Sequence, residues 1–126
     1  MQDFDTVGAH VLADFWGCQF EKLDDEELLM DYLRQAAKNA QMTVLGEESY
    51  KFSPQGFTGL LLLSESHISI HTYPEHGYAA IDVFTCGGGK TQKAIDFLKE
   101  VLQPDRVNQM VVRRGIPASV ETTLSA

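Results

Sequence analysis

The chain has 126 residues, and its ten Lys and Arg against eighteen Asp and Glu give a formal net charge of −8. This length, with 44% hydrophobic and 22% charged residues, is typical of one globular domain, here residues 1–126. The negative charge repels nucleic acid and anionic membrane surfaces, so we expect neither as a partner.

The apolar runs and the cysteine content indicate a cytoplasmic protein. The longest strictly apolar run is the four leucines at 60–63, whereas a helix needs roughly 20 apolar residues to cross a bilayer. The first ten residues carry acids in place of the bases of a secretory signal, so we expect no such signal. Two cysteines, Cys18 and Cys86, are too few for a disulfide framework and fit a reducing compartment.

The first half of the chain is predicted to hold two strands and one helix. Residues 7–17 alternate roughly between polar and apolar, which predicts a strand. A helix is predicted over 24–40, where Asp24 or Asp25 caps the start and apolar residues recur at helical spacing. Residues 42–52 predict a second strand, and Ser-Pro-Gln-Gly at 53–56 predicts a turn.

The second half is predicted to contain more strands and a second helix. Residues 57–72 form one long β-rich stretch that polar residues interrupt at 64–67. A turn at 73–77 and a strand over 78–86 follow, and three glycines at 87–89 predict a flexible break. A helix over 91–102 ends before Pro104, a last strand covers 106–113, and the tail after Gly115 is predicted to be loosely ordered.

The predicted order, β-α-β-β-β-α-β with short connections, indicates an α+β fold. We expect an antiparallel sheet with two helices on one face, a two-layer sandwich. The four consecutive leucines suggest that the sheet is buried on both faces, and we therefore expect a dimer that associates through its sheets.

Two motifs that suggest ligands are weak. The glycines before Lys90 resemble a phosphate-binding loop, but Phe84 stands where that motif requires glycine. His67 and His71 on one straight strand would lie roughly 13 Å apart, too far to chelate one ion. A site from His71, His76 and Cys86 would need a hairpin to bring the three together, and we expect no metal.

The polar residues Glu65, Ser66, His71 and Cys86 lie within or beside apolar, β-rich sequence. A GxSxG sequence is missing, which argues against a conventional serine hydrolase. A cysteine nucleophile paired with His71 stays open on spacing alone, as does the reading of both as ordinary core residues.

Ser-Glu-Ser-His-Ile-Ser-Ile-His-Thr-Tyr-Pro-Glu at 64–75 and Gly-Tyr-Ala-Ala-Ile-Asp-Val-Phe-Thr-Cys-Gly at 77–87 closely resemble the short prokaryotic S-adenosylmethionine decarboxylase proenzymes. The resemblance extends to 8–18 and 52–59 and covers most of residues 7–87. It implies self-cleavage between Glu65 and Ser66, which would give a β chain of residues 1–65 and an α chain of residues 66–126. The Ser66 hydroxyl would attack the preceding carbonyl, and elimination followed by hydrolysis would leave a pyruvoyl group as cofactor.

The resemblance also implies roles in that cleavage for two other residues. His71 would remove the α-proton of Ser66, and the Thr58 hydroxyl matches a serine that supports processing in the family. Ser66 and His71 are five positions apart, so a flat strand would point them to opposite faces. We therefore expect a bulge or bend near Ser66.

The implied activity is decarboxylation of S-adenosylmethionine, through a Schiff base with the pyruvoyl group, to the aminopropyl donor for spermidine synthesis. Cys86 would donate a proton to the product, since a thiol is mostly protonated near neutral pH. Adenine would stack between Phe52 and Tyr73, and Glu75 would accept hydrogen bonds from the ribose.

Family members form homodimers of cleaved protomers with sites between two facing sheets, which the resemblance extends to this chain. Two other functions stay open. Pyruvoyl-dependent decarboxylation of L-ornithine or L-arginine would use the same scaffold, and a non-catalytic relative would act as an interaction or regulatory subunit.

Overall fold

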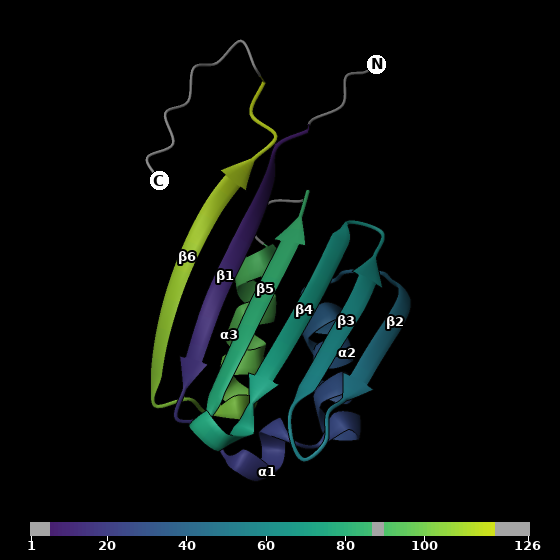
Figure 1. Cartoon of the computed structure of the whole chain (residues 1–126). Helices are drawn as coiled ribbons and strands as arrows, with labels where there is room; N and C mark the ends of the chain where they lie inside the picture. Colours follow the sequence, from purple (N-terminus) through teal and green to yellow (C-terminus); the bar gives the residue numbers. More distant parts are fainter. Residues whose placement is uncertain (1–5, 87–89, 118–126) are drawn as a thin grey trace.

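The fold is a six-stranded antiparallel sheet with helices on one face, seen in a computed structural model that describes residues 6–86 and 90–117. The strands run in the order β2-β3-β4-β5-β1-β6 across the sheet (Figure 1). Their bounds are β1 Gly8–Trp16, β2 Val44–Lys51, β3 Phe57–Leu63, β4 Ser66–Tyr73, β5 Tyr78–Thr85 and β6 Arg106–Arg114. The helices are α1 Phe20–Leu23, α2 Glu26–Asn39 and α3 Lys90–Leu102, with a short 3₁₀ helix η1 at Pro74–His76.

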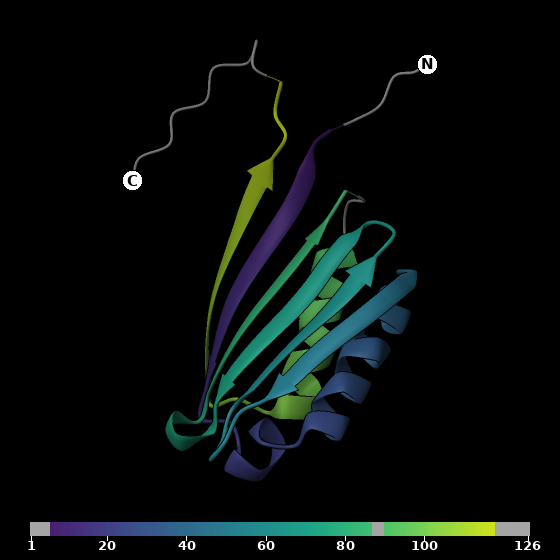
Figure 2. The ribbon, with the colours of Figure 1, turned by 45° about the vertical axis from the view of Figure 1, so that its right-hand side comes forward.

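The two long helices, α2 and α3, cover the same face of the sheet, as the turned view in Figure 2 shows. At the start of α2 the Asp25 side chain accepts a hydrogen bond from the Leu28 N–H, which satisfies one of the free amides of the first turn. The apolar stripes of both helices pack on the apolar side of the strands. Fully buried side chains of this core include Phe15, Leu29, Leu33, Phe57, Leu61, Ile68, Ile70, Ile95 and Leu98.

The face of the sheet away from α2 and α3, here called the open face, carries every second side chain of each strand. In β3 and β5 buried and more exposed residues alternate strictly, as expected for strands with one covered face. Large apolar side chains nevertheless lie exposed on the open face: Leu12, Leu60, Leu62 and Met110 are 41%, 41%, 54% and 62% exposed. These exposed side chains fit the expectation that another surface covers this face.

The structure confirms the α+β fold with both long helices on one face, and it corrects one predicted element. Residues 57–72 form two strands, β3 and β4, joined by the two-residue turn Ser64–Glu65. The polar pair reverses the chain, and the two halves then pair antiparallel with Leu62 opposite His67. The short helix α1 was not predicted. The glycine break at 87–89 and the tail beyond residue 117 lie outside the described residues.

The bulge expected near Ser66 is also wrong. The β3–β4 and β4–β5 ladders run without a register shift from the turn to Tyr73. The bend near Ser66 is the hairpin turn itself, which ends just before β4 begins.

Among the described helices, none combines the length and apolar character needed to cross a membrane.

Candidate active site

Three groups of polar or aromatic side chains lie on or beside the open face. The first, here called the turn group, comprises Glu65, Ser66 and Cys86. Ser66 begins β4 directly after the turn and pairs with Thr85 of β5, so Cys86 follows at the same end of the sheet. Cys86 is exposed and Ser66 is half-buried.

The Glu65 side chain is held beside the bond that is predicted to break. Its carboxylate accepts a hydrogen bond from the Thr43 N–H at 3.3 Å and lies 3.9 Å from Lys90 Nζ. Desolvation alone would raise the pKa of this carboxyl, but hydrogen bonds from Thr43 and Ser64 outweigh it, so the pKa lies below the ordinary glutamate value. Glu65 is therefore anchored as a carboxylate at neutral pH.

The second group, here called the aromatic group, lies at the opposite end of β3 and β4. It comprises Phe52, Thr58, His71, Tyr73 and Glu75, which line one hollow of about 320 Å³. Thr58 and His71 face each other across the β3–β4 ladder, with Thr58 Oγ1 3.0 Å from His71 Nδ1. The rings of Phe52 and Tyr73 are 45% and 47% exposed, so both present free faces for a planar ligand.

Two further aromatic residues extend this group and were not singled out from the sequence. Tyr78 stacks on Tyr73 with ring centroids 5.5 Å apart, and Trp16 stacks on Tyr78 at 4.3 Å. The Tyr78 hydroxyl donates a hydrogen bond to Asp14 at 2.6 Å, which together with burial raises the pKa of Tyr78 to about 12. The sequence signal was the aromatic residue at each strand end, but only the sheet order makes them neighbours.

The turn group and the aromatic group do not meet within one chain. Ser66 and His71 are five positions apart on one extended strand, which corresponds to roughly 16 Å. Transfer of the Ser66 α-proton to the His71 ring requires contact at about 3 Å. One copy of the chain therefore does not bring Ser66 and His71 together.

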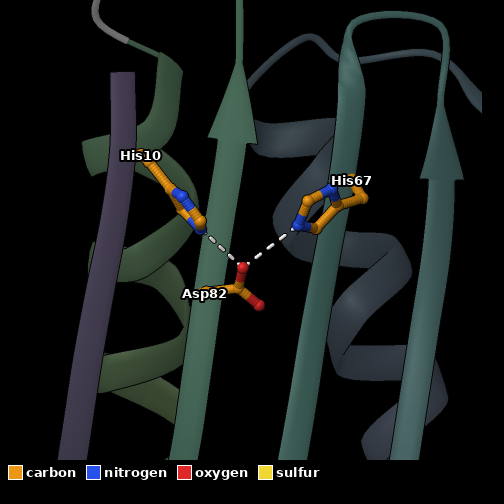
Figure 3. Close-up of side chains that lie close together, drawn as sticks. All are labelled: His10, His67 and Asp82. Carbon is orange, nitrogen blue, oxygen red and sulfur yellow. Dashed lines mark hydrogen bonds and ion pairs between the residues drawn. The ribbon is translucent and has the colours of Figure 1, made fainter. Parts of the chain in front are cut away.

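The third group lies between the other two and consists of His10, His67 and Asp82, on β1, β4 and β5 (Figure 3). Asp82 Oδ2 lies 2.6 Å from His10 Nε2 and 3.0 Å from His67 Nε2, and the Ser69 hydroxyl donates to Asp82 Oδ1. Arg114 approaches His10 Nδ1 at 3.5 Å from the far side.

These contacts were missed because they join residues 15 and 72 positions apart. Within the described residues, His10, His67 and Asp82 are the one set of three possible metal ligands that converge. The combination of His71, His76 and Cys86 considered from the sequence is not formed.

Comparison with known proteins identifies relatives over nearly the whole chain. Residues 9–115 match the family model for S-adenosylmethionine decarboxylase. The S-adenosylmethionine decarboxylase proenzyme of Persephonella marina is 49% identical over 94% of this chain and 90% of its own length. The proenzyme of Aquifex aeolicus is 46% identical over 88% and 83%. A crystal structure of the Aquifex aeolicus adenosylmethionine decarboxylase superposes with a TM-score of 0.86 at 41% identity, covering 95% of this chain and all of that one.

Proposed function

The chain belongs to the S-adenosylmethionine decarboxylase family and is a decarboxylase of S-adenosylmethionine, and we propose that it works through a pyruvoyl group formed from its own Ser66. The observation that carries this proposal is the position of Ser66. It is the first residue of a strand, directly after a two-residue turn, with Cys86 at the same end of the sheet.

The surroundings of the Glu65–Ser66 bond suit a cleavage that leaves the fold intact. The bond lies in the turn between β3 and β4, and both strands pair with other strands as well as with each other. The β chain, residues 1–65, would keep β1, β2 and β3, and the α chain, residues 66–126, would keep β4, β5 and β6. Three of the five ladders, β3–β4, β5–β1 and β1–β6, join strands of different pieces, so backbone hydrogen bonds would hold the two pieces together after cleavage.

Once formed, the pyruvoyl group would supply a carbonyl that reacts with the substrate amine and so provides an electron sink for decarboxylation. The chain's own residues then bind the substrate and move protons. Cys86, exposed beside Ser66, is the proposed proton donor to the product carbon. His71, held by Thr58, is the proposed base that removes the Ser66 α-proton during cleavage.

The hollow of the aromatic group is the proposed binding site for the nucleoside part of the substrate. Adenine would lie between the exposed faces of Phe52 and Tyr73, where aromatic rings attract both a flat base and a sulfonium cation. Glu75 would accept hydrogen bonds from the ribose hydroxyls. Tyr73 offers less stacking area than a tryptophan would, so we expect its contribution to affinity to be modest.

The separation of the turn group from the aromatic group supports a homodimer that is packed through the open faces. Face-to-face sheets lie about 10 Å apart with their side chains interdigitating. A two-fold axis that lies between the two open faces and crosses the strands would place the turn group of each copy against the aromatic group of its partner. The exposed side chains Leu12, Leu60, Leu62 and Met110 would be buried by this arrangement.

The alternative functions have less support. The family model and the named relatives are S-adenosylmethionine decarboxylases, which disfavours both L-ornithine or L-arginine as substrate and a non-catalytic role. The cytoplasmic location and the independence from metal stay predictions.

Mass spectrometry of the purified protein tests the proposal. We expect two fragments, residues 1–65 and 66–126, the second with a pyruvoyl group that reacts with phenylhydrazine. Ser66→Ala should remain one chain, because it has no hydroxyl to attack the Glu65 carbonyl. CO₂ release should be seen with S-adenosylmethionine and not with ornithine or arginine. A wild-type chain that folds but stays intact would contradict the proposal.

A further inference from the structure

The ring of His67 lies between the Ser66 hydroxyl and the Asp82 carboxylate. Its Nδ1 is 3.4 Å from Ser66 Oγ, and its Nε2 is 3.0 Å from Asp82 Oδ2. The order hydroxyl, imidazole, carboxylate is the one in which histidine takes a proton from serine while a carboxylate holds the ring. Neither His67 nor Asp82 has a role in the function proposed above.

The contacts of Asp82 determine which nitrogen of His67 carries the proton. Burial alone would raise the pKa of the Asp82 carboxyl, but hydrogen bonds from Ser69, His10 and His67 outweigh it and lower the pKa below the ordinary value. An ionised carboxylate only accepts hydrogen bonds, so the His67 Nε2 donates to it. In the neutral ring Nδ1 is then unprotonated and directed at Ser66 Oγ.

A metal ion explains the same group less well. Two ligand atoms bound tetrahedrally to one ion at about 2.0 Å each lie roughly 3.3 Å apart. His10 Nε2 and Asp82 Oδ2 are only 2.6 Å apart, which is the length of a direct charge-assisted hydrogen bond. The group is therefore closed by its own hydrogen bonds.

Resting on the proposed self-cleavage, we propose that His67 is the catalytic base for its first step, and that Asp82 is a positioning residue for His67. The Ser66 Oγ proton moves to His67 Nδ1 as Oγ bonds to the carbonyl carbon of Glu65. The bond from that carbon to the Ser66 nitrogen then breaks, and the proton passes from His67 to the departing amine. The products are an ester between Glu65 and Ser66, a free amine and a neutral His67. Removal of the α-proton by His71 is the next and separate step.

Time courses of cleavage during in vitro translation test this assignment. Part of each sample is treated with hydroxylamine, which cuts an ester between Glu65 and Ser66 but leaves an amide intact. For His67→Ala we expect cleavage about 10²-fold slower or more, with an intact chain that hydroxylamine does not cut. Added imidazole should restore part of the rate. Asp82→Asn should slow cleavage about 10-fold and add little to the His67→Ala loss, since both act on one step. By contrast, His71→Ala should accumulate the hydroxylamine-sensitive ester.

The matched control is His10→Gln, which removes the other histidine on Asp82 without a contact to Ser66. We expect a change of less than about 3-fold, because the glutamine amide can still donate a hydrogen bond to Asp82 and no proton is transferred at His10. Equal slowing by His10→Gln and His67→Ala would mean that the cluster is only structural, and would overturn the inference. An ester in His67→Ala, or loss of wild-type cleavage in EDTA, would overturn it too.

Circular dichroism checks the folding of His67→Ala and of His67→Gln, and a folded variant of either kind that cleaves at the wild-type rate contradicts the role of His67. Failure of the proposed function looks different. In that case the wild-type chain itself stays intact, and His71→Ala gives no ester.

Discussion

Two inactive variants, Ser66→Ala and His71→Ala, are expected to restore each other when they are co-expressed. The reasoning rests on the roughly 16 Å of strand between the two residues, which one chain does not bridge. In a mixed dimer the intact Ser66 of one copy would meet the intact His71 of the other. One of the two sites is then complete, and the second lacks both groups.

The expected yield follows from random pairing. If equal amounts of both variants pair without preference, about half of the His71→Ala chains lie in mixed dimers and are cleaved. The Ser66→Ala chains stay intact throughout. Two different affinity tags allow the mixed dimers to be isolated in sequence, and intact-protein mass spectrometry counts the cleaved chains of each kind.

The converse pairing serves as a control. Wild-type chain in a mixed dimer with the double variant Ser66→Ala, His71→Ala should stay uncleaved, since its Ser66 faces the partner's substituted position 71. If each copy carried a whole site, the wild-type chain of this pair would be cleaved and the two single variants would never restore each other. That pattern would refute the shared-site argument.

Substrate affinity, core packing and the pH dependence of folding each depend on a particular side chain. Glu75→Gln should raise KM for S-adenosylmethionine about 10- to 100-fold, because a hydrogen bond to a charged group contributes about 1.5–3 kcal/mol; steady-state CO₂ release measures this, and an unchanged KM contradicts the ribose contact. In the uncleaved Ser66→Ala background, Leu33→Ala at the fully buried α2 position should lower the free energy of unfolding by about 2–5 kcal/mol in urea. Leu45→Ala, 62% exposed on β2, should change it by less than about 0.5 kcal/mol, and equal losses would contradict the burial argument. Asp82→Asn should be less stable than its parent near neutral pH. Because folding lowers the pKa of Asp82, this difference is fully present above the unfolded pKa of about 4 and is lost as the pH falls through the lower folded pKa. A difference that grows on acidification would contradict it.

Most residues of the candidate site were predicted from the resemblance of the sequence to a known family. Phe52, Thr58, His71, Tyr73 and Glu75 were proposed from motif resemblance, and the structure gathers them around one hollow. Their separation from Ser66 was only half predicted. Alternation along a strand indicated that Ser66 and His71 point to opposite faces, and a bulge was expected to correct this. A bulge does not shorten the distance between the two residues along the strand, and the ladders contain none there.

The sequence by itself determined most of the secondary structure, because strand alternation, helical spacing, capping and turn chemistry are local properties of neighbouring residues. Only the tertiary structure decided which distant side chains meet. The approach of His10 and His67 to Asp82 requires β5 to lie between β1 and β4, and that strand order is set by packing of the whole sheet against α2 and α3. Contacts across strands depend on register and order, which no short stretch of sequence encodes.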